Sequence, residues 1–328
     1  GLAGALYGFI PGALKAYTSN AAQLQTGKGL PETRDSGRPT SRCNDTDSNT
    51  QRGVPDVAED GKGYGELVLL EKKEQGYGII TLNRPDQRNA MSRAAQAELV
   101  AALDDSRDCK VIIITGNGPA FCAGVDLKEN REMRGGETAR QFAHGSQSWV
   151  DANEAVRKHP AAMIAAVNGF ALGGGLTLAH NCELAIASEK AQFGMPEFGF
   201  GTFPGLAGPA TIRRILPKHA AYMIMTARRI DAHTAERWGI VNQVVPHEEL
   251  LPTAEALAQH ICQFDPILID YSKKAIRDLD LMPWDDGLVY GGYIGTMIRQ
   301  QSTASAEGLD RFARGEKNVG QGADVPTT

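Results

Sequence analysis

The pattern of apolar positions changes near residue 63. Residues 28–62 are rich in Gly, Pro, Ser, Thr, Asn and Asp and show no hydrophobic periodicity. Such a segment cannot bury enough apolar surface to offset the chain entropy lost on folding. We therefore expect residues 1–63 to form an N-terminal extension, disordered or loosely packed, ahead of a core over 64–265 and C-terminal helices with a tail over 266–328.

Short apolar runs after Tyr64 predict strands. ELVLLEKKE and YGIITLNRP are typical of two strands joined by a tight turn at Gly76. The later runs are short, β-branched and apolar throughout, which favours strands buried on both faces. They are KVIIITG (110–116), MIAAVNG (163–169), CELAIAS (182–188) and VNQVV (241–245).

Helical segments alternate with these strands. Ser92 is placed to cap a helix through AAQAELVAAL, and Asp231 to cap one through HTAERWG. Further helices are expected over 137–158, from Gly174 onward, from about Ile212, and over 248–314. The alternation of strand and helix predicts an α/β core with parallel strands.

Composition excludes several classes of protein. The 328 residues carry a formal charge of −5, which argues against a sequence-independent nucleic-acid binder. The odd number of cysteines, without a CxxC pair, favours reduced thiols in a reducing compartment over disulfides or structural zinc. They are Cys43, Cys109, Cys122, Cys182 and Cys262.

Targeting signals are weak. No apolar run reaches the length of a membrane-spanning helix, so no membrane partner is expected. We therefore expect a cytoplasmic location. The alternative is the mitochondrial matrix, because the first residues are apolar and no acidic residue precedes Glu32, although the lack of arginine before Arg34 is untypical of a transit peptide.

The common motifs of nucleotide, metal and serine-nucleophile sites do not match. The sequence contains no P-loop, no H-E-x-x-H and no G-x-S-x-G, and TGNGPAFCAG has Phe121 where a dinucleotide fingerprint needs its third glycine. The histidines are scattered, so we expect no metal site. Cys122 has no activating neighbour in the sequence and is expected to be a packed thiol.

Two glycine-containing turns remain, each following a buried strand. One is FCAGVDL (121–127) and the other LGGG (172–175). In a parallel sheet such turns meet at the carboxyl ends of the strands, where ligands bind. Glycine allows close approach of a ligand to backbone N–H groups, and two converging N–H groups can stabilise an enolate oxygen. Tight packing of strand against helix explains either turn equally well.

Four ordered segments carry a resemblance to a known family. They are ITLNRPDQRNAM (80–91), GNGPAFCAGVDLKE (116–129), residues 160–205 around NGFALGGGLTLAHN and MPEFGFGTFPG, and AYMIMTARRIDAHTAERWGIVNQVV (221–245). Together they resemble the crotonase, or enoyl-CoA hydratase/isomerase, superfamily. The resemblance covers about residues 64–315. It implies a spiral of ββα units followed by helices used in trimerisation, a homotrimer or dimer of trimers, and a coenzyme A thioester as substrate without a cofactor.

The resemblance also assigns roles to residues. It places the oxyanion-hole amides at Val125 and Gly174, with Gly173 beside them, and a catalytic carboxylate at Glu197. It implies that Ala123, Asp126 and Lys128 lie where the adenine and phosphates of CoA bind. It makes Arg84 and Asn89 mainly structural and leaves Lys317 as a loosely aligned candidate for contact with a CoA phosphate in a neighbouring subunit.

Two positions depart from the hydratase pattern. Thr177 stands where typical hydratases of the family carry a second catalytic glutamate, and a Thr hydroxyl is a poor base at neutral pH. Gly205 stands where hydroxyacyl-CoA hydrolases and dienoyl-CoA isomerases place an Asp. One glutamate beside an oxyanion hole suits isomerisation of a 3-enoyl-CoA to a 2-enoyl-CoA, while hydration stays open.

Two alternatives accompany this interpretation. Hydroxycinnamoyl-CoA hydratase-lyases resemble this chain in carrying a small hydroxylic residue at the Thr177 position. Phe198, Phe200 and Phe203 are then candidates for an aromatic acyl pocket, although they suit a hydrophobic core equally well. The other alternative is a catalytically silent CoA-binding scaffold that retains the fold.

Overall fold

The computed structural model describes residues 63–129 and 139–316, with side chains described outside 139–147. The predicted N-terminal extension, apart from Gly63, and the candidate Lys317 therefore lie outside the described residues. The division into 1–63, 64–265 and 266–328 stays a prediction. Its second boundary coincides with the turn between the helices α9 (Leu250–Cys262) and α10 (Pro266–Leu279).

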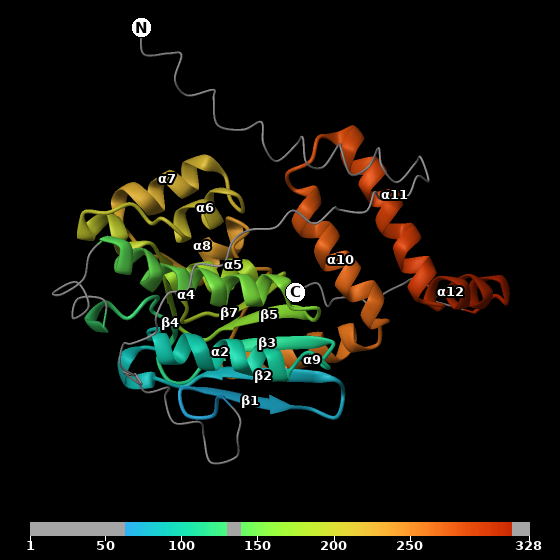
Figure 1. Ribbon diagram of the computed structural model, residues 1–328, viewed down its shortest axis with the longest axis horizontal. Helices are drawn as coiled ribbons and strands as arrows, with labels where there is room; N and C mark the ends of the chain where they lie inside the picture. The colour runs from blue at the N-terminus through green and yellow to red at the C-terminus, as the bar shows by residue number, and fades with distance from the viewer. Residues whose placement is uncertain (1–62, 130–138, 317–328) are drawn as a thin grey trace, which may run out of the picture. The chain divides into compact units, whose positions relative to one another are not determined.

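A six-stranded sheet forms the centre of the described fold (Figure 1). Its strands lie in the order β1-β2-β3-β5-β7-β10, and all neighbours are parallel except the β1–β2 hairpin. The strands are β1 (Val68–Lys72), β2 (Tyr77–Leu82), β3 (Val111–Gly116), β5 (Ala162–Val167), β7 (Leu184–Ser188) and β10 (Gln243–Val245). Each predicted strand is confirmed.

Both faces of this sheet are buried, as the uninterrupted apolar runs predict. Side chains alternate between the faces, so Ile112 and Ile114 point into one core and Val111 and Ile113 into another. The first core lies against α2 (Arg93–Asp105), α4 (Ala139–Lys158) and α5 (Gly174–Asn181). The second core lies against α9 (Figure 1).

A second, smaller sheet was missed by the sequence pattern. Its strands β4 (Ala120–Cys122), β6 (Phe170–Leu172), β8 (Gln192–Gly194) and β9 (Ile230–Asp231) have at most three residues each. Three of them follow strands of the large sheet directly, giving β3–β4, β5–β6 and β7–β8 pairs with helices after them. The chain thus repeats a strand–strand–helix unit, and both glycine turns follow strands of the small sheet.

Helices complete the described chain, as the sequence predicts from about residue 212, although the first begins earlier, at Ala207. In chain order they are α6 (Ala207–Ile212), α7 (Pro217–Thr226), α8 (Ala232–Arg237), α9, α10, α11 (Trp284–Gln301) and α12 (Ala304–Ala313). The expected caps are present, because Ser92 Oγ accepts from the Ala95 N–H and Asp231 Oδ1 from the Thr234 N–H. Within the described residues, no helix is long and apolar enough to cross a membrane.

Lys273 fixes α10 to the sheet. This buried lysine donates to the carbonyl oxygens of Val156 and Ala161 at 3.2 and 3.0 Å and pairs with Glu183 at 3.3 Å. Burial lowers the pKa of Lys273 and raises that of Glu183, but the two charges and the donated bonds compensate each other in part. The later helices α11 and α12 follow α10 outward from this anchor (Figure 1).

The start of α5 is pressed against β4 through a glycine. A Cβ at Gly175 would collide with the backbone carbonyl of Cys122. We therefore expect Gly175→Ala to lower the free energy of unfolding by about 2–3 kcal/mol, because backbone must shift to make room. Chemical unfolding followed by circular dichroism measures this change.

Gly292→Ala is the matched control. Gly292 is an exposed position inside α11, and a Cβ there meets nothing within 4 Å. Removing a helix-interior glycine should raise stability by roughly 0.5–1 kcal/mol. Equal effects of the two substitutions would contradict the assigned role of Gly175.

Candidate active site

The first turn is held by two buried asparagine side chains. Asn89 Nδ2 donates to the carbonyl oxygens of Asn117 and Ala120 at 3.0 and 2.7 Å, and Asn168 Nδ2 donates to that of Gly118 at 2.9 Å. These bonds satisfy carbonyl oxygens of the connection between β3 and β4 and of Ala120, the first residue of β4, just ahead of the first turn. The structure supports the interpretation of Asn89 as structural.

The backbone of this turn presents the Val125 N–H. Residues Met91 and Val125 form a parallel bridge in which Met91 N–H donates to Gly124 O at 2.8 Å and Asp126 N–H donates to Met91 O at 3.2 Å. In such a bridge the central residue directs its own N–H away from the partner strand. Among the described residues, the Val125 N–H has no hydrogen-bond acceptor.

The second turn places a helix N-terminus next to the first. Gly173 has φ +52° and ψ −117°, a conformation that suits glycine, and Gly174 opens α5 with its N–H outside the helical ladder. A Cβ at Gly124 would lie 3.0 Å from Gly174 N, so the two turns are in contact. The structure thus places the turn that carries Val125 against the turn that carries Gly174, whose N–H lies at the positive end of the α5 dipole. The catalytic roles of Val125 and Gly174 stay predictions.

Glu197 lies directly beside this pair. It belongs to the 3₁₀ helix η2 (Pro196–Phe200), which follows β8 and ends at Gly201 in the left-handed region. A Cβ at Gly173 would lie 2.5 Å from Glu197 Oε1, so only glycine leaves room for this carboxyl. Its Oε2 is buried without a hydrogen-bond partner among the described residues. Burial raises the pKa of Glu197, and the hydrogen bond from its own backbone opposes this only in part.

Thr177 lies one turn along α5 and is buried. Its Oγ1 is 3.4 Å from the Gly173 carbonyl oxygen, a long hydrogen bond that leaves the hydroxyl weakly held. The residue also lines a cavity of about 340 Å³ together with Val150 and Asn153 of α4 and residues of α6 and α10. At this position there is a hydroxyl and no carboxylate.

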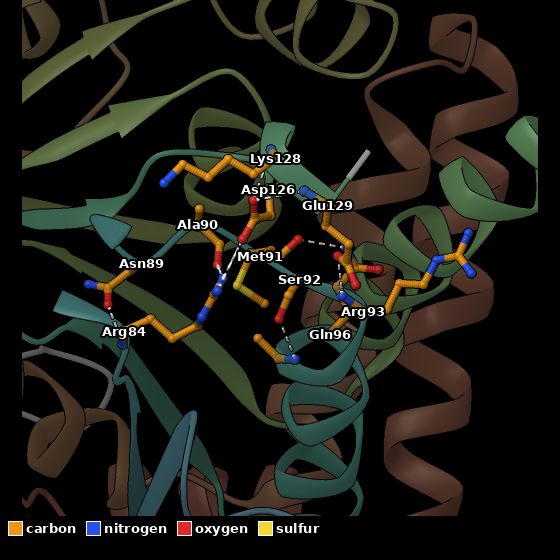
Figure 2. A network of polar contacts seen from close by, with 11 residues as sticks. Arg84, Asn89, Ala90, Met91, Ser92, Arg93, Gln96, Asp126, Lys128 and Glu129 are labelled. Carbon is orange, nitrogen blue, oxygen red and sulfur yellow. Dashed lines mark hydrogen bonds and ion pairs between the residues drawn. The ribbon is translucent and has the colours of Figure 1, made fainter. Parts of the chain in front are cut away.

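Asp126 is engaged in the structure of the loop. Its Oδ2 pairs with the Arg84 guanidinium at 3.0 Å, and its Oδ1 accepts from the backbone N–H groups of Lys128 and Glu129 at 3.1 and 3.3 Å. Figure 2 shows Arg84 reaching both Asp126 and the Ala90 carbonyl. Asp126 therefore positions the segment that follows it.

Lys128 is one of the residues that line an open pocket of about 520 Å³. Its side chain is exposed and points away from Asp126 (Figure 2). The pocket is lined by Leu67, Arg84, Gln87, Ser92, Asp126, Lys128 and Glu129. Ala123, in the same loop, is half-buried and donates its N–H to Arg88 O at 3.0 Å. An exposed ammonium beside an open pocket can meet a phosphate.

The interpretation of the three phenylalanines as core is wrong. Phe198, Phe200 and Phe203 are 51%, 68% and 56% exposed. Phe198 and Phe200 lie in η2 with Glu197, and Phe203 follows this helix. The open alternative, an aromatic lining near Glu197, stays a prediction.

Two site features were not predicted as such. Cys122 is buried as expected, but its sulfur also accepts the Gly124 N–H at 3.4 Å, and burial raises the pKa of the thiol to about 12. Trp149 of α4 lies against Gly174, with Nε1 2.6 Å from the position of a Cβ there. No local sequence signal marks Trp149, because its contact arises from the docking of α4 on α5.

Known proteins resemble this chain in sequence and in fold. The model of the family described as enoyl-CoA hydratase/isomerase matches residues 72–313. A protein of Mycobacterium bovis named "Probable enoyl-CoA hydratase echA8" is 39% identical over 231 residues, covering 69% of this chain and 86% of its own. The crotonyl-CoA hydratase of Syntrophomonas wolfei is 38% identical over 218 residues, covering 65% and 82%. The crystal structure of an enoyl-CoA hydratase subunit from Geobacillus kaustophilus superimposes with TM-score 0.71 at 32% identity, covering 78% and 97%.

The Arg84–Asp126 pair gives the site a testable pH dependence. Burial alone would raise the pKa of Asp126, but the bonds from Arg84, Glu129 and Lys128 outweigh it and lower the pKa. A depressed carboxyl pKa stabilises the fold above the unfolded value of about 4, and the contribution is lost as pH falls further. We expect Asp126→Asn to cost about 1–3 kcal/mol at pH 7.

Chemical unfolding at a series of pH values checks this expectation. The difference between wild type and Asp126→Asn should shrink as pH falls below about 4. The matched control is Glu74→Gln, at an exposed position in the turn between β1 and β2. A difference for Asp126→Asn that grows toward acid pH would contradict the assigned ion pair.

Proposed function

Because the chain belongs to the enoyl-CoA hydratase/isomerase family, and is an enzyme of that family, we propose that it isomerises or hydrates an enoyl-CoA with Glu197 as its main acid and base. One observation carries the proposal. The Glu197 carboxyl, whose Oε2 has no partner among the described residues, lies against Gly173. The next residue, Gly174, contributes a free N–H. An acid–base group next to an oxyanion hole suits proton transfer at the carbon beside a carbonyl.

In this proposal the thioester oxygen accepts hydrogen bonds from Val125 N–H and Gly174 N–H. Negative charge grows on that oxygen when a proton leaves C2. The two donors and the N-terminus of α5 are held in place before the reaction, so they need no reorganisation as the charge develops. Val125 contributes through its backbone, so the nature of its side chain is secondary.

Glu197 then moves one proton between two carbons. As a carboxylate it removes a proton from C2 of a 3-enoyl thioester, and the electrons form a dienolate. The carboxylic acid so formed returns the proton to C4, which leaves the 2-enoyl thioester and the original carboxylate. The raised pKa of Glu197 favours this exchange, because base and acid forms become closer in free energy at neutral pH.

Hydration needs a second group that this chain supplies only weakly. Water must be held and activated at C3 while a proton reaches C2, and one carboxyl then serves both steps. The Thr177 hydroxyl can hold a water but is not a base. We therefore rank isomerisation above hydration. A hydroxycinnamoyl-CoA hydratase-lyase is the second candidate, since the exposed Phe198 and Phe200 share η2 with Glu197.

The rest of the substrate is assigned by position. We propose that Ala123 and Lys128 lie along the adenine and phosphates of CoA, with the Lys128 ammonium on a phosphate. Gly173 then lies beside the thioester, and Asp126 acts by holding the Lys128 backbone. Phe200 is proposed as an acyl contact. The proposal requires no metal or cofactor, since proton transfer is its only chemistry.

The outer helices α11 and α12 carry exposed apolar side chains that bear on how subunits assemble. Trp284, Val289 and Phe312 of α11 and α12 are 78%, 76% and 70% exposed. Large exposed apolar side chains on neighbouring helices are typical of subunit interfaces. They support the proposal of a homotrimer, or a dimer of trimers, built through these helices. The cytoplasmic location, with the mitochondrial matrix as alternative, stays a prediction.

Glu197→Gln tests the acid–base role. We expect it to lower kcat for 3-enoyl-CoA isomerisation about 10²–10⁴-fold, because the amide cannot accept the proton. Binding of butyryl-CoA, measured by calorimetry, should change little. In the wild type, kcat/KM should fall as pH drops through the raised pKa of Glu197, since the carboxylate is the reactive form.

The control for this substitution is Glu189→Gln, at an exposed position after β7. It should leave turnover within about twofold, as surface substitutions away from a site do. Full activity of Glu197→Gln would exclude the proposed role. Binding without turnover of any enoyl-CoA by the wild type would favour the silent scaffold.

Thr177 separates isomerisation from hydration. Thr177→Val removes the hydroxyl at nearly constant shape, so it should slow hydration of crotonyl-CoA about tenfold and leave isomerisation within about threefold. Thr177→Ser, which keeps the hydroxyl, is the matched control. Chromatography of the isomer and hydrate products gives both rates, and an equal loss in both would show that the hydroxyl plays no part in holding water.

A further inference from the structure

Two buried side-chain atoms in the described part of the chain lack a hydrogen-bond partner. They are Glu197 Oε2 and Trp149 Nε1. One is an acceptor and the other a donor, and they lie beside adjacent residues, Gly173 and Gly174. Leaving a buried polar group unpaired costs about 1–3 kcal/mol, so two such groups at one turn call for a common explanation.

Trp149 is not a loosely placed side chain. It is 3% exposed, and its ring edge lies against Gly174, with Nε1 and Cε2 at 2.6 and 3.1 Å from the position of a Cβ there. A larger residue at 174 would displace the indole. A phenylalanine at position 149 would keep an aromatic ring in this place without an unpaired N–H.

The segment of α4 that carries Trp149 is fixed on both sides. Ser148 Oγ donates to Gln96 Oε1 at 2.6 Å, and Gln96 Nε2 donates to Met91 O, the carbonyl that also holds the Val125 turn. Asn153 Nδ2 donates to Trp149 O, and Asn181 Nδ2 donates to Asn153 Oδ1, both at 2.8 Å. The indole is therefore positioned by the same network that positions the oxyanion donors.

We infer that the Trp149 indole N–H is a substrate-contacting donor that binds an oxygen on C3 of the acyl group. This inference rests on the proposed acyl-CoA function. The thioester oxygen already has two proposed backbone donors, whereas an oxygen on C3 has only the weakly held Thr177 hydroxyl, whose bond to the Gly173 carbonyl oxygen is 3.4 Å long. Three carbons separate the C3 oxygen from the thioester oxygen, so the two oxygens lie close together. When the thioester oxygen is bound at the Gly174 N–H, a donor beside Gly174 is therefore close enough to reach the C3 oxygen.

The consequence is a preference within the substrate class. Acyl groups with a 3-oxo or 3-hydroxy oxygen pair the indole N–H, whereas a plain saturated acyl group leaves it unpaired. A site built to hydrogen-bond an oxygen discriminates against the analogue that lacks it. Trp149 thus acts on ligand selection, separately from the proton transfer by Glu197.

Indole N–H resonances test the contact directly. The chain has three tryptophans, 149, 238 and 284, so indole-¹⁵N labelling of the full chain gives three signals. Acetoacetyl-CoA, butyryl-CoA and free CoA serve as probes. We expect the Trp149 signal to move downfield with acetoacetyl-CoA only, while the other two indole signals stay in place.

Affinity measurements provide the second readout. Trp149→Phe should weaken acetoacetyl-CoA binding about tenfold and leave butyryl-CoA binding within about twofold, as expected for one lost hydrogen bond. The matched control is Trp238→Phe, which changes an indole stacked on His219. If Trp149→Phe does not fold, Trp238→Phe and Trp284→Phe assign the Trp149 signal by elimination, and the wild-type spectra decide.

The possible outcomes distinguish a failure of this inference from a failure of the proposed acyl-CoA function. A Trp149 signal that moves equally with butyryl-CoA and acetoacetyl-CoA would assign the donor to the thioester oxygen and overturn the inference. A signal unmoved by ligands that calorimetry shows to bind would overturn it and leave the proposed function standing. Absence of binding of every acyl-CoA would overturn both.

Discussion

The site depends on one steric constraint, the contact of two backbone turns without side chains between them. The first residues of α5 lie directly against the carbonyl of Cys122, and Gly124 faces Gly174 N at the distance of a tight contact. Any Cβ at these positions would push the turns apart. Because the turns that carry Val125 and Gly174 can touch only without these side chains, the glycines determine the packing of the site and, in the proposed mechanism, the positions of its two N–H donors.

Buried polar groups have hydrogen-bond partners in the scaffold, whereas two of them lack a partner at the site. Just ahead of the first turn, Asn89 and Asn168 donate to the carbonyl oxygens of Asn117, Gly118 and Ala120. At the second turn, Glu197 Oε2 and Trp149 Nε1 are buried and unpaired. The hydrogen-bonded loop around Asn89 and Asn168 thus supports a site in which two polar atoms are unpaired. This arrangement is expected where the missing partner is a ligand.

Much of this could be predicted from local sequence patterns. Strands such as Val111–Gly116 are continuous β-branched runs, and the caps Ser92 and Asp231 precede clear helical periodicity, so each was identified from its neighbours alone. The strands of the small sheet have at most three residues, too few for any periodicity. Trp149 lies 25 positions before Gly174, and the exposure of Phe200 depends on the path of η2, so both are set by tertiary packing.

Cys122 gives the turn contact a chemical consequence. Its thiol is fully buried, it accepts the Gly124 N–H, and burial raises its pKa to about 12, so the reactive thiolate is suppressed while the turns touch. The sulfur is attached to the residue whose carbonyl meets Gly175. Separation of the two turns would expose the Cys122 thiol and, in the same motion, move the N–H groups of Val125 and Gly174 apart. The rate at which the Cys122 thiol is alkylated therefore measures how often the two turns separate.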